Sequence, residues 1–157
     1  MYKHSADYLK QTVFVTANII LLLVLLRLFV FDIARINGLS MEDTLSDAEI
    51  KLVDRISYFF AEPQRYQVVQ FYEPQEKHVL TVKRIIGVPG DTVIIKRGKV
   101  FISKEPLKEE ELTELYLQEG VQTYTRGNLP MALVVPDNSY FVLGDNRFAS
   151  VDSRDYG

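Results

Sequence analysis

Near the N-terminus, residues 12–31 form an apolar run, TVFVTANIILLLVLLRLFVF, that only Asn18 and Arg27 interrupt. A helix of this length spans about 30 Å, which is the thickness of the hydrocarbon core of a bilayer. A cleaved secretory leader would have a shorter apolar region and a small-x-small cleavage site, and neither occurs before Arg35. We therefore predict a permanent transmembrane anchor over residues 12–31. Arg27 lies about one turn from its end, where the side chain can extend to the interface; the alternative is a functional charge within the membrane.

The charges that flank the apolar run predict its orientation. Lys3 and Lys10 lie on the short N-terminal side, against a single arginine just beyond the run. Positive charge favours the cytoplasmic side of a membrane. We therefore expect residues 1–11 to form a cytoplasmic tail and residues 36–157 to form an extracytoplasmic domain.

From Ile36 onwards, short β-branched and aromatic segments alternate with Gly, Pro, Asn and Asp, which is typical of a mostly β domain. The expected strands lie in KLVDRISYFF, YQVVQFYE, HVLTVKRIIGV, DTVIIKRG, KVFIS, MALVVP and SYFVLGD. The exception is EPLKEEELTELYLQEG, residues 105–120, where Leu107, Leu112 and Leu115 stand among acidic residues. This segment indicates a short exposed helix or an irregular insertion.

The composition argues against several classes of function. The net charge is −3 and no cluster of Lys and Arg occurs, so a nucleic-acid partner is not expected. The chain has no Cys, which removes disulfides, thiolate metal sites and cysteine nucleophiles. His4 and His78 are the only histidines, which argues against a His-based zinc site. We expect no metal and no cofactor.

A lysine stands in the middle of the predicted strand HVLTVKRII, where an unpaired ammonium would be costly to bury. Alternation along the strand places Lys83 on one face with Thr81 and Ile85, and Arg84 on the other face. Arginine stays charged and needs a carboxylate, whereas a desolvated lysine can lose its proton and act as a general base. The alternative is a lysine that extends to solvent from an edge strand.

A nucleophile for such a base is available in INGLSMEDTL, soon after the anchor. Here Ser40 is flanked by Leu39 and Met41 and follows Gly38, which permits close approach of the backbone. A serine in such a position can equally be a turn residue or a helix cap.

The C-terminal segment GDNRFASVDSRDYG, residues 144–157, concentrates polar groups directly after an apolar strand. One reading is a hydrogen-bonded loop. Another is a calcium loop with oxygen ligands from Asp145, Asn146, Asp152 and Asp155. The interspersed cations Arg147 and Arg154 argue against a cation site.

Taken together, these three segments resemble bacterial type I signal peptidases, the S26 family, in their Gram-positive form with a single membrane anchor. The family's serine segment, close to S-M-x-P-T-L just after the anchor, corresponds to SMEDTL. Its lysine and arginine, in a strand before a V-x-G-D type turn, correspond to VKRIIGVPGD. Its last motif, close to G-D-N-x-x-x-S-x-D-S-R-x-x-G, matches GDNRFASVDSRDYG at every fixed position. The resemblance runs in order from the anchor to the final residue.

The resemblance implies chemical roles for the matched positions. Ser40 would attack the scissile carbonyl and Lys83 would accept its proton, in a serine–lysine dyad that needs neither histidine nor metal. Ser150 would hydrogen-bond the lysine amine and orient it. The Ser40 N–H would be one oxyanion donor. Gly38, two residues before the serine, has no hydroxyl, so a second donor would have to be another group.

The resemblance also implies supporting ion pairs. Arg84 would pair with Asp145, and Arg154 with Asp152, and together the pairs would fix the last loop against the strand that carries the lysine.

The implied substrates are exported preproteins with small residues before the cleavage site. An extended chain would be held at a sheet edge, with Leu39 and Met41 as walls of shallow pockets. The implied surroundings are the cell membrane, with its lipid bilayer, and the protein-export channel. The implied fold is a single transmembrane helix followed by a signal-peptidase-like, mostly β domain.

Two features depart from the family pattern. The proline of the serine motif is replaced by Asp43, next to Glu42. Because a carboxylate near Lys83 would favour the ammonium, we expect both side chains to point to solvent. The chain also stops at Gly157, where the family continues through about another strand, so we expect a truncated domain with an exposed edge.

Three alternative functions fit parts of the pattern. The first is a catalytically weak or inactive anchored β domain that binds or assembles secreted or pilus-like proteins, against which both Ser40 and Lys83 argue. The second is a serine–lysine self-cleaving repressor, against which the anchor and the lack of a DNA-binding helical segment argue. The third is a serine hydrolase with His78 as its base, which a substitution can test.

Overall fold

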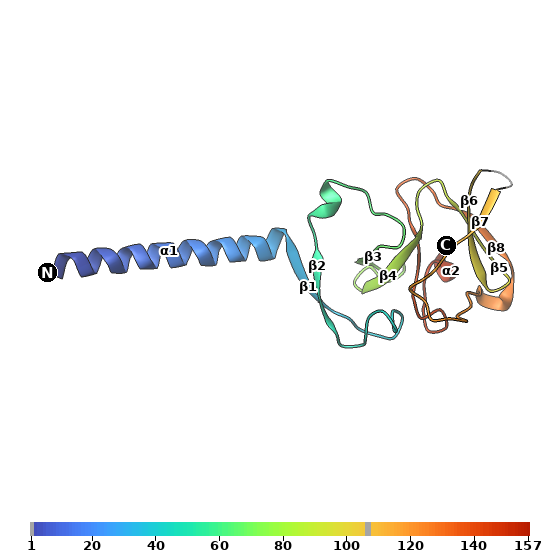
Figure 1. Cartoon of the computed structure of the whole chain (residues 1–157), viewed down its shortest axis with the longest axis horizontal. Coiled ribbons are helices and arrows are strands. Elements are labelled where there is room, and N and C mark those ends of the chain that lie inside the picture. The colour runs from blue at the N-terminus through green and yellow to red at the C-terminus, as the bar shows by residue number, and fades with distance from the viewer. Residues whose placement is uncertain (1, 106–107) are drawn as a thin grey trace. The chain divides into compact units, whose positions relative to one another are not determined.

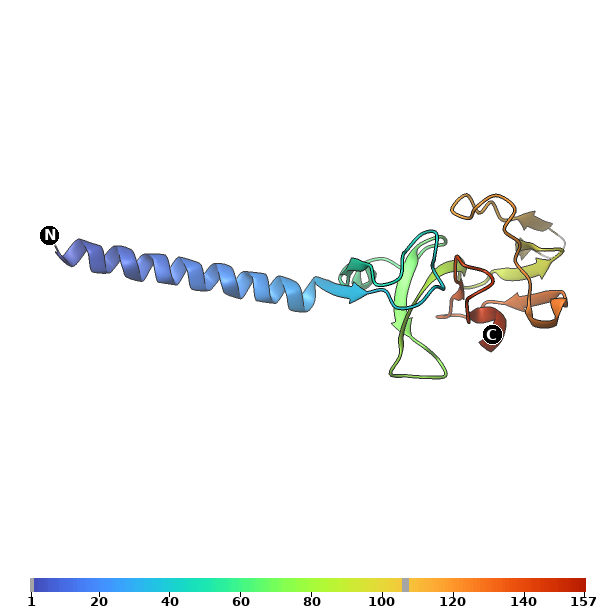
Figure 2. The same cartoon turned by 90° about the horizontal axis from the view of Figure 1, so that it is seen from below.

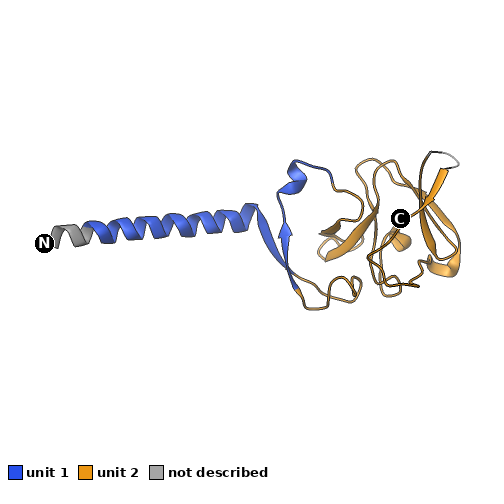
Figure 3. Cartoon of the chain, in the orientation of Figure 1, with its two compact units in different colours: residues 1–34, 50–62 blue, residues 35–49, 63–157 orange. Residues whose placement is uncertain are grey.

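The computed structural model of the protein describes residues 2–105 and 108–157. The chain divides into two compact units, which Figure 3 shows in different colours. Unit 1 comprises residues 1–34 and 50–62, and unit 2 comprises residues 35–49 and 63–157. The segments singled out for chemistry all belong to unit 2.

Unit 1 begins with one long helix, α1, Tyr2–Phe29 (Figure 1). Within it, Asp7–Phe29 is long and apolar enough to cross a bilayer, by length and composition alone. The helix ends two residues before the apolar run does, because Phe31 begins a strand. The Arg27 side chain extends past the helix end and pairs with Asp32, with Nη1 and Oδ1 2.7 Å apart.

A two-stranded sheet follows the helix in unit 1. It pairs β1, Phe31–Arg35, with β2, Ile50–Asp54. The Arg55 N–H donates to the Val30 carbonyl at 2.9 Å, so the end of β2 lies beside the end of α1.

The sequence predicts one strand through KLVDRISYFF, but β2 stops at Asp54 and a 3-10 turn, η1, Ser57–Phe59, follows. The Asp54 carboxylate explains the change, because it accepts the N–H groups of Ile56 at 2.9 Å and Ser57 at 3.1 Å and so closes a local turn. This turn leaves Phe59 and Phe60 81% and 84% exposed.

Unit 2 contains two antiparallel sheets (Figure 1). The first has the order β3-β4-β9, with β3 at Val68–Tyr72, β4 at Leu80–Gly87 and β9 at Phe141–Leu143. The second has the order β7-β6-β5-β8, with β7 at Lys108–Glu111, β6 at Lys99–Glu105, β5 at Thr92–Lys96 and β8 at Met131–Val134. Residues 73–79 form a turn between β3 and β4 that projects from the first sheet (Figure 2).

The strand that carries Lys83 is the central strand of its sheet. Lys83 pairs with Val69 of β3, and Arg84 pairs with Leu143 of β9. Lys83 therefore does not extend to solvent from an edge strand, and β4 is buried from Lys83 to Gly87.

The hydrophobic core of unit 2 is formed mainly by strand residues from both sheets. Its buried members are Ile86, Val93, Ile95, Val100, Ile102, Val135, Phe141 and Leu143. Leu112 and Tyr116 pack against this cluster and are partly buried. Both come from the segment that the sequence predicts to be an exposed helix or an irregular insertion.

From Leu112 onwards that segment is irregular, which is one of the two structures predicted for it. Its first part is a strand, which was not predicted. Lys108–Glu111 forms β7, which pairs with β6. Charges pair between strands: Lys96 contacts Glu109, and the Lys99 ammonium lies 2.6 Å from the Glu111 carboxylate. These contacts and the free edge of β6 outweigh the helix propensity of glutamate. Leu107 lies outside the described residues.

Candidate active site

Ser40 lies in a tight turn at the surface of unit 2. The Glu42 N–H donates to the Leu39 carbonyl at 3.1 Å, and the Leu45 N–H donates to the Met41 carbonyl at 2.8 Å. Ser40 itself is half-buried. Among the described residues, no hydrogen bond is formed by its backbone N–H, which leaves that donor available to a ligand.

The loop that follows β9 contacts this turn through its backbone. The Asn146 N–H donates to the Ser40 carbonyl at 3.1 Å. Gly144 lies closer still: a Cβ atom at this position would overlap Ser150 Oγ and would lie 2.5 Å from the Ser40 carbonyl oxygen. Only glycine therefore fits between the serine turn and the Ser150 side chain.

Lys83 approaches the same glycine from β4. Because Arg84 pairs with Leu143 in antiparallel strands, Lys83 and Gly144 lie at the same end of this strand pair. Gly144 thus lies against Ser40 and Ser150, and the strand register places Lys83 at the same end of the sheet, although the three residues are far apart in the sequence.

The Lys83 side chain is buried, with 3% exposure. Burial lowers its pKa from the ordinary value of 10.5; the carboxylates of Asp152 and Glu73 raise the pKa in opposition, and the Arg154 guanidinium lowers it. Within residues 2–105 and 108–157, no hydrogen bond or ion pair holds the Lys83 amine. This environment favours the neutral amine over the ammonium more than water does.

Arg84, the next residue, is paired. Its Nε donates to Asp145 Oδ1 at 2.9 Å and its Nη2 to Oδ2 at 2.6 Å, and both side chains are buried. Thr44 Oγ1 donates to the same Asp145 carboxylate at 2.6 Å. The ion pair that the sequence predicts is therefore present. Through Thr44, the serine turn also bonds to its carboxylate.

The second predicted ion pair is also present. Arg154 Nε donates to Asp152 Oδ1 at 2.8 Å. Asp152 caps the short helix α2, Ser153–Tyr156, and its Oδ2 accepts the Gly144 N–H at 3.0 Å. One buried carboxylate thus fixes both the glycine and the end of the loop.

Two buried hydroxyl groups near this cluster have no partner among the described residues: Ser150 Oγ and Tyr156 Oη. The predicted hydrogen bond from Ser150 to Lys83 is therefore not formed in this structure, although Ser150 lies against Gly144. Burial raises the pKa of Tyr156 to about 12, together with the carboxylates of Asp152 and Glu73, so this phenol is neutral.

The side chains expected to contact substrate differ in access. Leu39 is 51% exposed, whereas Met41 is 1% exposed and belongs to the interior. Neither lines the open groove of about 430 Å³ that runs beside Ser150, between Tyr124 and Phe148. Glu42 and Asp43 are exposed, as expected, and neither is among the charges that act on Lys83.

Comparison of the sequence with known proteins assigns the chain to one family. The family described as "Signal peptidase, peptidase S26" matches residues 9–157. The chain belongs to this signal peptidase family. Signal peptidase I of Bacillus licheniformis is 37% identical over 136 residues, which cover 86% of this chain and 72% of the relative. A probable signal peptidase I-1 of Synechocystis sp. is 34% identical over 158 residues, with 96% and 76% covered.

Among solved structures, a signal peptidase I from Enterococcus faecalis V583 is 31% identical; the match covers 62% of this chain and 88% of the other, with a TM-score of 0.48. Membership in the signal peptidase family makes the chain a serine endopeptidase, a hydrolase that acts on preproteins to remove signal peptides. It excludes the alternative of a self-cleaving repressor.

The sequence analysis did not predict the part that several residues play in this site. Thr44 joins the Arg84–Asp145 pair, and Glu114 forms a buried ion pair with Arg147. A buried arginine needs a carboxylate, so Arg147 was a signal that an acidic partner exists. The acidic run at residues 109–114 offered several candidates, and the sequence does not distinguish among them.

The close fit at Gly144 gives a test of the site geometry. In Gly144→Ala, the new Cβ must displace the Ser150 side chain and the Ser40 backbone. We expect signal peptide cleavage to fall by about a hundredfold in kcat, because an error of about 1 Å in such a site has that effect. Activity would be measured beside Ala149→Ser, a change at an exposed residue of the same loop, which we expect to keep wild-type activity. Normal turnover by a folded Gly144→Ala variant would contradict the crowding described here.

Proposed function

We propose that Ser40 is the nucleophile and Lys83 the general base of this signal peptidase. The observation that carries the proposal is the state of Lys83: its amine is buried, has a lowered pKa, and has no ion pair within the described parts of the chain. Arg84, one residue later, has a complete set of partners. A structural cation would be paired as Arg84 is, whereas a base must be free to gain and lose a proton.

In the proposed reaction Lys83 accepts and gives up a proton twice, first the proton of Ser40 and then a proton of water. The neutral Lys83 amine takes the proton of Ser40 Oγ as this oxygen bonds to the scissile carbonyl carbon. The resulting ammonium gives the proton to the amine that leaves when the peptide bond breaks, and an acyl group remains on Ser40. Lys83 then takes a proton from water, the hydroxide hydrolyses the acyl-enzyme, and the proton returns to Ser40.

Two further groups support this chemistry. The free Ser40 N–H is available as an oxyanion donor, where charge develops in the transition state. Ser150 Oγ is buried beside Gly144 without a partner, which is costly unless the hydroxyl is used. We assign it to the Lys83 amine, which it orients when substrate excludes water from the site.

The first test uses a preprotein whose leader ends in Ala-x-Ala, because small residues before the cleavage site are the proposed recognition feature. Full-length protein in lipid vesicles should cleave after the second alanine. Ser40→Ala and Lys83→Ala should each lower kcat/KM by about a thousandfold or more, since each removes a reacting group. His78→Ala should cleave normally, because His78 is exposed in the turn between β3 and β4. Wild-type cleavage by the Ser40 or Lys83 variant would reject the dyad.

The second test uses the charges around Lys83. The neutral amine is the active form, so kcat/KM rises with pH as Lys83 loses its proton. Glu73 raises the Lys83 pKa, so Glu73→Gln should lower this pKa and shift the rising limb of the pH profile to lower pH. The matched control is Glu76→Gln in the same turn, because Glu76 is not among the charges that act on Lys83. A limb that stays in place, or moves to higher pH, in Glu73→Gln would contradict the assignment of Lys83 as the base.

We also propose that α1 anchors the enzyme in the cell membrane with residues 1–11 in the cytoplasm. Lys3 and Lys10 support this orientation. Unit 1 also supports a membrane–water interface at the C-terminal end of the helix. The Arg55 N–H bonds to the Val30 carbonyl at this end, and the exposed Phe59 and Phe60 follow Arg55 in the sequence. In this orientation unit 2 lies outside the cytoplasm, where preproteins leave the export channel.

Protease protection tests the orientation. Protease added to intact spheroplasts should digest a tag placed after Gly157 and should spare a tag placed before Met1. Inverted membrane vesicles should give the opposite pattern. Digestion of the N-terminal tag in intact spheroplasts would show that the orientation is reversed.

A further inference from the structure

Residues 113–123, TELYLQEGVQT, follow β7 and contact all three parts of the proposed active site. We propose that this stretch, called the bracing segment from here on, positions the catalytic groups, and that Glu114 is its main positioning residue. The inference rests on the proposed function, because it concerns the placement of Ser40, Lys83 and Ser150.

The first contact of the bracing segment is with the loop that contains Ser150. The Glu114 carboxylate accepts from Arg147 Nη1 at 3.1 Å and also from Nη2, and the two side chains are 11% and 0% exposed. Arg147 Nε donates to the Gly144 carbonyl at 3.0 Å. Because Gly144 touches both the Ser40 backbone and Ser150, a shift of Arg147 would displace the groups that transfer the proton.

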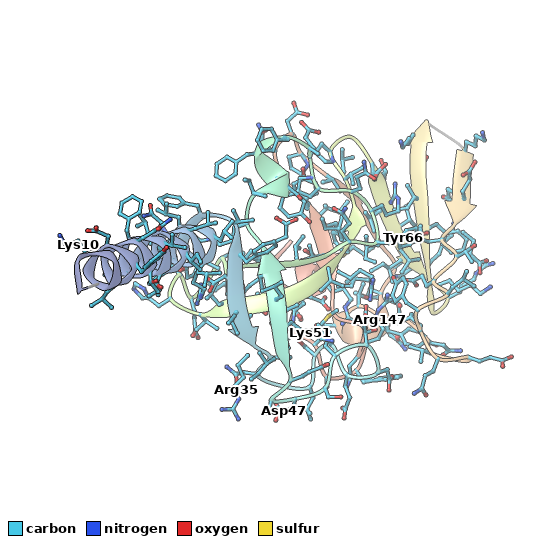
Figure 4. The ribbon with its side chains drawn as sticks, turned by 60° about the vertical axis from the view of Figure 1, so that its left-hand side comes forward. Lys10, Arg35, Asp47, Lys51, Tyr66 and Arg147 are labelled. Carbon is cyan, nitrogen blue, oxygen red and sulfur yellow. The ribbon has the colours of Figure 1, made fainter. Side chains whose placement is uncertain are left out.

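The second contact is with the strand that contains Lys83. The Tyr116 ring centroid lies 4.1 Å from Arg84 Cζ, which is a cation–π contact. Its hydroxyl accepts from Arg147 Nη2 at 3.1 Å, and Tyr66 packs edge-on against its ring at 5.9 Å (Tyr66 and Arg147 are labelled in Figure 4). Tyr116 thus links the arginine beside Lys83 to the arginine of the Ser150 loop.

The third contact is with the serine turn. Gln118 Nε2 donates to Asp43 Oδ1 at 2.9 Å. Asp43 has a φ of 83°, a left-handed conformation that is strained for a residue with a Cβ and impossible for proline. The hydrogen bond from Gln118 therefore helps to hold a strained turn, and Ser40 lies three residues earlier in that turn.

These contacts share a pattern that fits positioning. Each contact is made to a residue that is close in the sequence to a proposed catalytic group. Arg84 is next to Lys83, Arg147 is in the loop of Ser150, and Asp43 is in the turn of Ser40. The bracing segment itself provides no group that touches the proposed reacting atoms. Its effect is to couple three parts of the chain that must keep their mutual geometry during the reaction.

The decisive variant is Glu114→Gln in full-length protein in vesicles, assayed with the Ala-x-Ala preprotein. The amide keeps the shape but removes the charge that neutralises the buried Arg147. We expect kcat to fall by about ten- to a hundredfold with KM unchanged, at a temperature where a melting curve shows the variant folded. The rising limb of the pH profile should not move, because Glu114 is not among the charges that act on Lys83.

Glu119→Gln is the matched control, since it removes an exposed carboxylate from the same segment and should keep the wild-type kcat. A folded Glu114→Gln variant with a kcat within about twofold of wild type would overturn the inference. So would a loss confined to KM.

Gln118→Ala serves as a second variant, because its bond to Asp43 is exposed and its loss leaves the core intact. We expect a kcat a few times lower than wild type with KM unchanged. If Glu114→Gln does not fold, a wild-type kcat in Gln118→Ala overturns the inference. The two proposals fail differently: absence of Ser40-dependent cleavage in the wild type defeats the proposed function, whereas normal cleavage by both variants defeats only the bracing role.

Discussion

The buried ion pair between Arg84 and Asp145 is the interaction on which the site depends. It joins β4 to the loop after β9, and Thr44 adds the serine turn to the same carboxylate. Removal of one partner of such a pair costs about 3 to 5 kcal/mol, because the other charge stays buried without compensation. The three segments with recognisable motifs are therefore held together by a charge pair one residue away from the proposed base. Its neighbours, Asn146 and Gly144, then place the Ser40 backbone against the loop.

The contrast between Lys83 and Arg84 links this architecture to function. Both side chains are buried on a central strand and point to opposite faces, yet Arg84 has a carboxylate, a hydroxyl and a carbonyl as partners, whereas the Lys83 amine has no hydrogen bond in the described residues. Arginine keeps its charge in any environment, so it needs these partners. The same desolvation lowers the pKa of a lysine, which can then lose its proton. One strand thus supplies a permanent charge that holds the site together and the amine that we propose as the base.

The sequence predicts the elements whose signals are local. The length of the apolar run predicts α1, and the alternation of residues predicts β4. The order of the three motifs indicates the family. The sequence does not predict β7, because the strand depends on pairing with β6 and on ion pairs of its glutamates with Lys96 of β5 and Lys99 of β6, which form only in the folded chain. It also misses the partners of Arg147 and Asp43, since Glu114 and Gln118 reach them only through the folded chain. The hydrogen bond expected between Ser150 and Lys83 came from resemblance, and the structure leaves Ser150 Oγ unpaired.

Titration of the Lys83 amine itself tests whether this lysine is the general base. Lysine labelled with ¹³C at Cε would be incorporated into the full-length protein, and the Lys83 resonance would be assigned by its loss in Lys83→Ala. We predict that this resonance titrates below the ordinary lysine pKa of 10.5, at the pH where activity rises. A Lys83 resonance that titrates with the exposed lysines, in a protein that already cleaves preprotein at neutral pH, would contradict this prediction.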